Sequence, residues 1–440
     1  YSFHQTLRLT GAVVLLFDMQ LDKNRISTGS KNWIRYFFHL HQEGKLSIGF
    51  KFKSDSFADS LHYIFNRTGI LYGAALTNLY CSPKFVSHLT KEEKLKLLLF
   101  ENLFFVYGCH HNGEKDIYDE FLQSIDTFYK KFRTKIPLWD FDFDNKVEHI
   151  LEKTLSERVK IKSNISKGNY WLNQSTNGLV FVDVLLYISF LTDQEIDPVK
   201  SYDELVITLL LFLTKAAYGD GKIEDKEKRL LQYLLSSSHL DDLQKKEITK
   251  GIVSPIPNHV IGSFNSNALN NKFIFELCVF VACGTHTVHP NEERNLKKIG
   301  RELNLSSPET DEGFIVGRTF VFKNKEQLAI LNEEKSSGIL FKAIQKKWLL
   351  ILGRNKEKLF SEIKQSKGLM DLVGKSSIRE LSTDEKKQFK NQLYDILKSM
   401  PSLAIFMLPG GAILLPLVIK LFPDLLPSAF KENTIDKNPT

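Results

Sequence analysis

The sequence predicts an all-α protein: several helical bundles followed by a C-terminal hydrophobic segment that prolines interrupt. Three observations lead to this fold class. Apolar residues recur every three or four positions over much of the chain, whereas the alternation typical of strands is scarce. The prolines before residue 400 fall between these periodic stretches, at predicted joints. At 440 residues the chain is also too long for one ordinary core, so two to three domains are expected.

Three regions follow along the chain. Residues 1–195 form an N-terminal helical region, residues 196–312 a second helical domain, and residues 320–440 a C-terminal domain. A stretch rich in Pro, Asn and Ser predicts a long loop over Ser254–Asn271. Helical spacing predicts helices over Glu92–Tyr107, Ile117–Phe132, Tyr202–Ala217, Glu224–Leu235, Phe273–Cys283, Glu292–Leu303 and Ile339–Leu352.

The second region contains an internal repeat. The stretch Ala216–Leu234 aligns with Val281–Ile299 at an offset of 65 residues. The identities include Ala217 with Ala282, Gly219 with Gly284, Glu227 with Glu292, and Arg229 with Arg294. Each copy ends an apolar helix, turns at Gly and begins a charged helix, because Gly accepts the conformation that closes a helix. The repeat therefore predicts two helix pairs related by a pseudo-two-fold axis.

The turn of the first copy is acidic, with carboxylates at Asp220, Glu224, Asp225 and Glu227. One interpretation is that they cap a helix and form a solvated face. The other is that their oxygens bind a hard cation such as calcium or magnesium. The Asp-Gly turn and downstream Glu227 resemble the tellurite-resistance TerB family, and this resemblance implies a link to metal ions. In the second copy Thr285 and His286 replace the Asp-Gly pair, which argues against a symmetrical acidic metal site. Capping is favoured because acidic residues commonly occupy the first turn of a helix.

The net charge of +7 is concentrated in one stretch. Residues 323–398 hold 17 Lys and Arg against 10 Asp and Glu, and the remainder of the chain is balanced. Such a stretch suits anionic lipid headgroups or RNA phosphates. The lysines predicted to form this basic surface are Lys346, Lys347, Lys386, Lys387, Lys390 and Lys398.

An uncharged segment follows at once. Ser399–Ile419 is 21 residues long, and a helix of that length matches the roughly 30 Å hydrocarbon core of a bilayer. A membrane segment is therefore predicted at about residues 400–421, spanning or re-entrant. The alternative is a hairpin buried in a helical bundle, with its turn at Pro409–Gly411. If the segment spans, the excess of Lys on its N-terminal side places the helical domains in the cytoplasm.

The residues from Leu414 to Phe430 read LLPLVIKLFPDLLPSAF. This motif resembles the leucine-zipper and EF-hand transmembrane (Letm) family of inner-membrane proteins. Together with the TerB-like stretch, it is similar to the bacterial Letm-related biofilm-associated group. The resemblance implies an inner-membrane location, a ribosome-binding domain, and ion exchange against protons. The family positions present are Pro401, Pro409, Pro416, Lys420, Pro423 and Pro427.

The function predicted from these features is that of a non-enzymatic adaptor on the bacterial inner membrane. Phosphate-binding, nucleophile-elbow, metalloprotease and dinucleotide motifs are absent from the sequence. Four cysteines in so long a chain predict a reducing compartment. The expected partners are membrane lipids, the ribosome and a second copy of the chain. The alternative is a cation-homeostasis protein, but Ala412 stands where better-known Letm members carry an acidic residue, which favours the adaptor.

Overall fold

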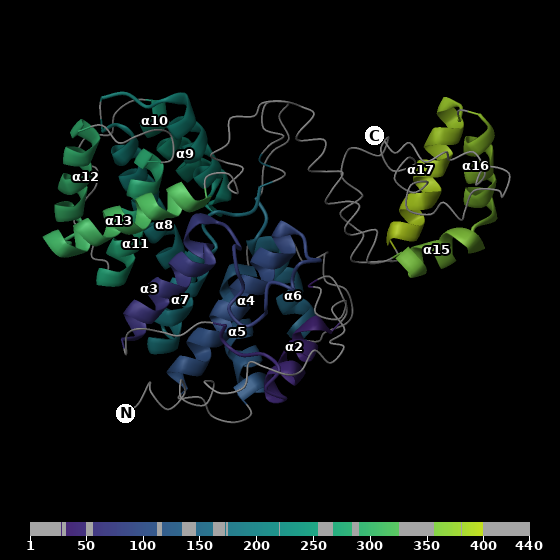
Figure 1. Cartoon of the computed structure of the whole chain (residues 1–440), viewed down its shortest axis with the longest axis horizontal. Coiled ribbons are helices and arrows are strands. Elements are labelled where there is room, and N and C mark those ends of the chain that lie inside the picture. Colours follow the sequence, from purple (N-terminus) through teal and green to yellow (C-terminus); the bar gives the residue numbers. More distant parts are fainter. Residues whose placement is uncertain are drawn as a thin grey trace, which may run out of the picture. The chain divides into compact units, whose positions relative to one another are not determined.

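The structure is a computed structural model (Figure 1) that describes residues 28, 32–49, 56–111, 117–133, 147–161, 172, 175–219, 221–253, 267–283, 290–324, 356–379 and 381–398. Within these ranges the regular elements are helices, and one isolated bridge joins Lys160 to Thr176. The all-α prediction is confirmed for this part of the chain. The predicted helix over Ile339–Leu352 and the predicted membrane segment at 400–421 lie outside it.

The chain divides into two compact units. The large unit comprises residues 1–21 and 34–334, and the small unit comprises residues 22–33 and 335–440. Helices from both sides of the predicted boundary near residue 195 belong to the large unit. Its helices are α2 (Trp33–Gln42), α3 (Phe57–Thr68), η1 (Ile70–Tyr72), α4 (Lys91–His110), α5 (Ile117–Arg133), α6 (Val147–Arg158), α7 (Phe181–Thr192), α8 (Pro198–Ala217), α9 (Asp225–Ser237), α10 (Asp242–Val253), α11 (Ala268–Cys283), α12 (Pro290–Glu302) and α13 (Ser307–Asn324).

Four buried helices form the centre of the large unit. They pack in the order α4, α7, α8, α11, and each contacts the next. The other helices cover this row: α5 and α6 pack on α4, α10 on α8, and α13 and α3 on α11. Burial on nearly all sides explains why α4, α7 and α11 are apolar around their circumference, as expected for helices in the core of a large unit.

Helix α2 is held on α4 and α5 by aromatic side chains. Phe37 lies edge-on to Phe100 with ring centroids 5.2 Å apart, and Phe38 lies 4.8 Å from Tyr118. Both phenylalanines are buried. Such pairs add to the energy of apolar burial when the rings meet edge to face or tilted. This cluster fixes the N-terminal part of the large unit to its central row.

The internal repeat is present as two helix pairs, α8 with α9 and α11 with α12. The apolar helices α8 and α11 pack against each other. The charged helix of each pair also packs on the apolar helix of the other pair, α12 on α8 and α9 on α11. Gly219 lies where the two copies meet, because a Cβ there would be 3.1 Å from the Cα of Glu292 on α12. The charged helix of each copy thus covers part of the apolar helix of the other copy. This reciprocal packing is what a pseudo-two-fold relation between the copies requires.

A close backbone contact joins two loops of the large unit. Gly73 has φ of +65°, and a Cβ on it would lie 2.5 Å from the Cα of Gly178. Only glycine fits at such a position without displacement. Tyr233 donates a hydrogen bond to the carbonyl of Thr176 (2.8 Å), and Ser237 accepts one from the Gly178 N–H (3.0 Å). These contacts hold the segment that leads into α7 and its buried Asp183.

Candidate functional site

The small unit contains three described helices, α15 (Lys356–Gln365), α16 (Lys367–Ile378) and α17 (Thr383–Lys398). They pack against one another in all three pairings. Gly368 allows α16 to approach α17, because a Cβ there would lie 2.7 Å from the Gln392 side-chain amide. The side chains buried in this unit include Leu359, Ile363, Leu369, Leu372, Val373, Leu381, Phe389 and Leu393.

The start of α17 is fixed by a capping box and an ion pair. Ser382 accepts a hydrogen bond from the Glu385 N–H (3.3 Å), and Glu385 accepts one from the Ser382 N–H (2.9 Å). Arg379 donates two hydrogen bonds of 2.7 Å to the same carboxylate. The Arg379 bond is the main reason that the pKa of Glu385 falls to about 2. The carboxylate is therefore ionised at neutral pH and paired with Arg379.

Three of the predicted basic residues lie together on α17. Lys386 and Lys387 are exposed and Lys390 is half-buried. Because Lys390 is four and three residues beyond the other two, the three share one side of the helix. Phe389 and Leu393 point into the packed interior of the small unit. We call Lys386, Lys387 and Lys390 the α17 basic face.

Other predicted positions in this region lie at or beyond the limit of the described residues. Lys398 is the last residue of α17, and its side chain is not described. Within the ranges that the structure describes, no helix is long and apolar enough to cross a bilayer. The positions outside these ranges are Lys346, Lys347, Pro401, Pro409, Pro416, Lys420, Pro423 and Pro427.

The acidic turn of the first repeat copy forms a helix cap. Glu224 is the N-cap of α9, and the Glu227 carboxylate accepts a hydrogen bond from the Glu224 N–H (2.9 Å). Glu227 is buried, whereas Asp225 is exposed, and Asp220 lies outside the described residues. In the part of the chain that the structure describes, no three His, Cys, Asp or Glu side chains are grouped so as to hold a metal ion.

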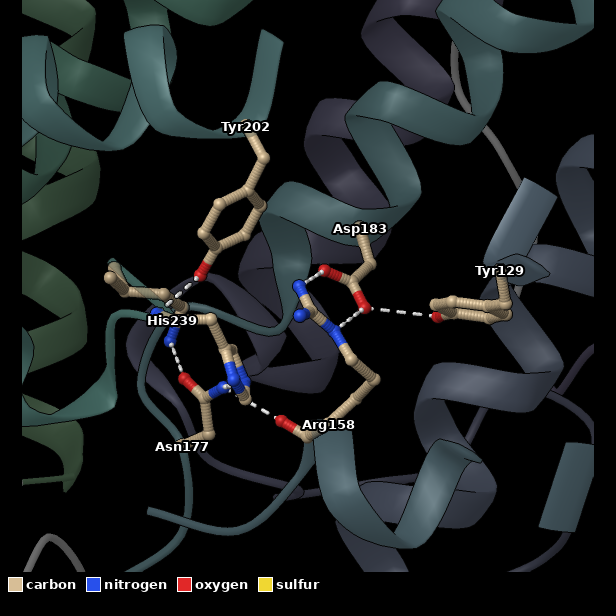
Figure 2. Close-up of polar contacts among 7 residues, drawn as sticks. Tyr129, Arg158, Asn177, Asp183, Tyr202 and His239 are labelled. Carbon is tan, nitrogen blue, oxygen red and sulfur yellow. Dashed lines mark hydrogen bonds and ion pairs between the residues drawn. The ribbon is translucent and has the colours of Figure 1, made fainter. Parts of the chain in front are cut away.

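Three buried helices each carry one acidic residue in an apolar run, and none of the three was predicted as a site. The first is Asp183 on α7, which is 1% exposed (Figure 2). Arg158, at the end of α6, donates two hydrogen bonds to it, of 2.7 and 2.5 Å. Tyr129 of α5 donates a third (3.0 Å). The carboxylate thus joins α5, α6 and α7.

The Arg158 guanidinium is enclosed as well as paired. It lies between the rings of Phe132 and Tyr202, with its central carbon 4.8 Å from each centroid. Burial acts to lower the pKa of Arg158, but the adjacent Asp183 charge outweighs it and raises the pKa. The Asn177 side-chain amide donates a hydrogen bond to the Arg158 carbonyl (2.7 Å) and so fixes the end of α6 (Figure 2). The network has the properties of a structural clamp.

The second acidic residue is Glu101 on α4, which is fully buried. It accepts backbone N–H bonds from Leu79 (2.8 Å), Tyr80 (3.1 Å) and Cys81 (2.9 Å), and a fourth bond from the Asn78 amide (2.9 Å). Burial raises the pKa of Glu101 and these donors act against the rise. The Glu101 carboxylate therefore accepts the backbone hydrogen bonds of the loop before α4, which a carbonyl would otherwise accept.

The third is Glu276 on α11, which is paired with His62 of α3. Asn66 donates to the same carboxylate (3.0 Å) and accepts a hydrogen bond from Tyr72 (3.0 Å). Burial acts to lower the pKa of His62, but the hydrogen bond and charge of Glu276, together with Glu312, raise it overall, while Lys272 opposes the rise. The pair therefore links α3 to α11 most strongly when His62 is protonated.

This pairing predicts a pH-dependent stability. A raised pKa in the folded state means that the stabilisation is complete below the ordinary His pKa, about 6.5, and is lost as pH rises through the raised value. Replacing His62 with Gln is expected to cost about 1.5–3 kcal/mol at about pH 6 and less at about pH 9. Urea unfolding at both pH values measures it. His39→Gln, at an exposed position of α2, is the control, and a His62→Gln cost that grows with pH would contradict the prediction.

One sequence signal could have found these three residues. Asp183, Glu101 and Glu276 each lie within a run that is otherwise almost entirely apolar. A charge at such a position is rarely buried unless it is paired. The partners themselves, among them Arg158 and His62, carry no comparable signal because they lie in ordinary amphipathic stretches.

Comparison with known proteins concerns the small unit. Residues 381–439 match a family model described as LETM1-like, RBD, a ribosome-binding domain. The match begins two residues before α17, so it includes the α17 basic face and extends through the proline-broken segment. It supports a relationship of this region to the Letm family and a ribosome-binding type of function. No curated protein and no solved structure matches the chain.

Proposed function

We propose that this protein is a non-enzymatic adaptor that binds the ribosome through its C-terminal region while that region is attached to the bacterial inner membrane. The observation that carries the proposal is the match of residues 381–439 to a LETM1-like ribosome-binding domain, which includes the α17 basic face. The chemistry agrees with this role. Lysine side chains on one side of a helix bind the phosphates of RNA without reading its sequence.

The surroundings of the basic face support the proposal. The capping box and the packed core of the small unit fix α17 as a helix, so its lysines are presented together. Of the two acidic residues in the first turn of α17, Asp384 and Glu385, Glu385 is paired with Arg379. The repulsion that this carboxylate would exert on an RNA phosphate is thereby reduced. A rigid cationic face loses less side-chain and backbone freedom on binding than a disordered one.

The membrane part of the proposal rests on the sequence after α17. The 21 uncharged residues from Ser399 to Ile419 suit the bilayer interior, and the lysines before them suit the cytoplasmic leaflet. The large unit is then a cytoplasmic body. The proposal also holds that the repeat of the large unit is a TerB-like domain and that the chain is one of the Letm-related biofilm-associated proteins.

The test is co-sedimentation of the full chain with purified ribosomes over a salt series. We expect it to pellet with ribosomes at about 50 mM salt and to be released progressively by about 500 mM, because phosphate contacts weaken with salt. Failure to pellet at low salt would remove the ribosome role. Alkaline carbonate extraction of membranes tests the anchor separately, since release of the intact chain would contradict attachment through residues 400–421.

A further inference from the structure

One face of α13 in the large unit presents two large apolar side chains to solvent. Ile315 is 67% exposed and Phe322 is 89% exposed. Seven residues, or about two helical turns, separate them, so they lie on the same face. The opposite face of α13 packs on α11. Gly313 and Gly317 allow that contact, because a Cβ on either would lie under 3 Å from an α11 side chain. The exposed face is therefore held in a fixed position.

The charges along this face are arranged by sign. Asp311 and Glu312, both exposed, lie about one turn before Ile315. Arg318 and Lys323, also exposed, lie on the C-terminal half. Arg318 is held in place by an ion pair of 3.5 Å with Glu293 of α12. The face is thus acidic before Ile315 and basic from Arg318 onward, with Phe322 between the two basic residues.

We propose that a second copy of this chain covers the face, with the two α13 helices antiparallel. A two-fold axis between residues 318 and 319 places Ile315 opposite Phe322 of the partner subunit. Glu312 then lies within two residues, about 3 Å along the axis, of Lys323 of the partner subunit. A parallel pair would set every charge of the face against its like, whereas in the antiparallel pair only Arg318, which is paired with Glu293, lies beside its own copy at the axis. The polarity of the face therefore selects a second copy in one orientation, as an isologous two-fold contact requires.

Other occupants fit the face less well. An anionic membrane would attract Arg318 and Lys323 but repel Asp311 and Glu312 at the other end.

The size of the face sets the strength of the dimer. Helix α13 has 18 residues and is about 27 Å long, so one helix pair buries less than the roughly 800 Å² per partner of a standard interface. We therefore expect association in the range of about 10–100 μM.

Sedimentation equilibrium of the full chain, at loading concentrations up to about 200 μM, tests the interface. We expect a monomer–dimer equilibrium that Phe322→Asp weakens at least tenfold. The matched control is Leu243→Asp on α10, which introduces the same charge at an apolar residue that is 74% exposed and should leave the equilibrium unchanged. A monomeric wild-type chain at these concentrations, or a Phe322→Asp chain that dimerises as the wild type does, would overturn the proposal.

A charge exchange tests the antiparallel orientation. Glu312→Lys and Lys323→Glu chains should each dimerise poorly alone, because like charges then meet at both ends. An equimolar mixture should recover dimers, since each mutated residue faces its complement on the other chain. Absence of recovery would contradict the orientation. Flotation with vesicles of phosphatidylcholine and phosphatidylglycerol examines the remaining occupant, and membrane binding that is lost in Phe322→Asp would overturn the proposal in favour of a lipid surface.

Discussion

Replacement of Arg158 by methionine is expected to lower the free energy of unfolding of the large unit by about 3–5 kcal/mol. The change leaves the Asp183 carboxylate buried, at 1% exposure, with Tyr129 as its remaining partner in the network. An uncompensated charge in the interior costs far more than the pair itself contributes. Methionine fills most of the volume that Arg158 occupies beside Phe132 and Tyr202. The loss of stability is therefore due mainly to the unpaired charge of Asp183 and less to a cavity. Urea unfolding followed by circular dichroism measures it.

A second variant separates the ion pair from the packing around it. Arg158→Met combined with Asp183→Leu removes both charges, and we expect the double variant to be more stable than Arg158→Met alone. Lys200→Met is the control, because Lys200 is exposed in a pair of 3.9 Å with Glu204, and such pairs are worth about 0–1 kcal/mol. A double variant less stable than the single one would show that the pair itself, rather than the unpaired charge, dominates.

Replacement of Lys386, Lys387 and Lys390 by alanine is expected to weaken ribosome binding about 100-fold. Each Lys near an anionic surface contributes on the order of 1 kcal/mol, and three such contributions correspond to about two powers of ten. The slope of log affinity against log salt should also fall by about two, because three phosphate contacts are lost. Co-sedimentation at several salt concentrations gives both quantities. Phe389 and Leu393 are unchanged, so the small unit keeps its core.

The matched control removes the same number of charges from the large unit. Lys228, Lys246 and Lys298 are all exposed, and none belongs to α17. Their replacement by alanine changes the net charge equally and should leave the affinity and the salt slope close to wild type. Equal weakening by both triple variants would mean that the overall charge of the chain, and not the α17 basic face, accounts for binding. An unchanged affinity in the α17 variant would contradict the face as the binding site.

Much of the large unit could be predicted from spacing alone. The predicted helices over Glu92–Tyr107, Ile117–Phe132 and Tyr202–Ala217 correspond to α4, α5 and α8. The repeat was recognisable because Gly and Glu recur at a fixed offset. Helices such as α7 and α13 were missed, since a helix buried on all sides or rich in Gly lacks a clear apolar stripe.

The candidate sites divide in the same way. The capping box at Ser382 and Glu385 was predictable because both partners are local, three residues apart. The pairing of Arg158 with Asp183 was not, because 25 residues separate its members and the sequence around Asp183 marks a buried charge without indicating its partner. The same holds for His62 and Glu276, which are 214 residues apart. Pairings of that kind follow from the tertiary packing, which no local pattern specifies.

The packing of α11, from the second repeat copy, on α8, from the first, has a consequence during synthesis of the chain. Helix α8 ends at residue 217, and α11, which covers its apolar side, ends at residue 283, so 66 further residues must be translated first. At about 5–20 residues per second, the uncovered side of α8 waits for roughly 3–13 s. The nascent chain therefore displays an apolar helix outside the ribosome for several seconds, which makes this interval the time at which chaperone binding or aggregation competes with folding.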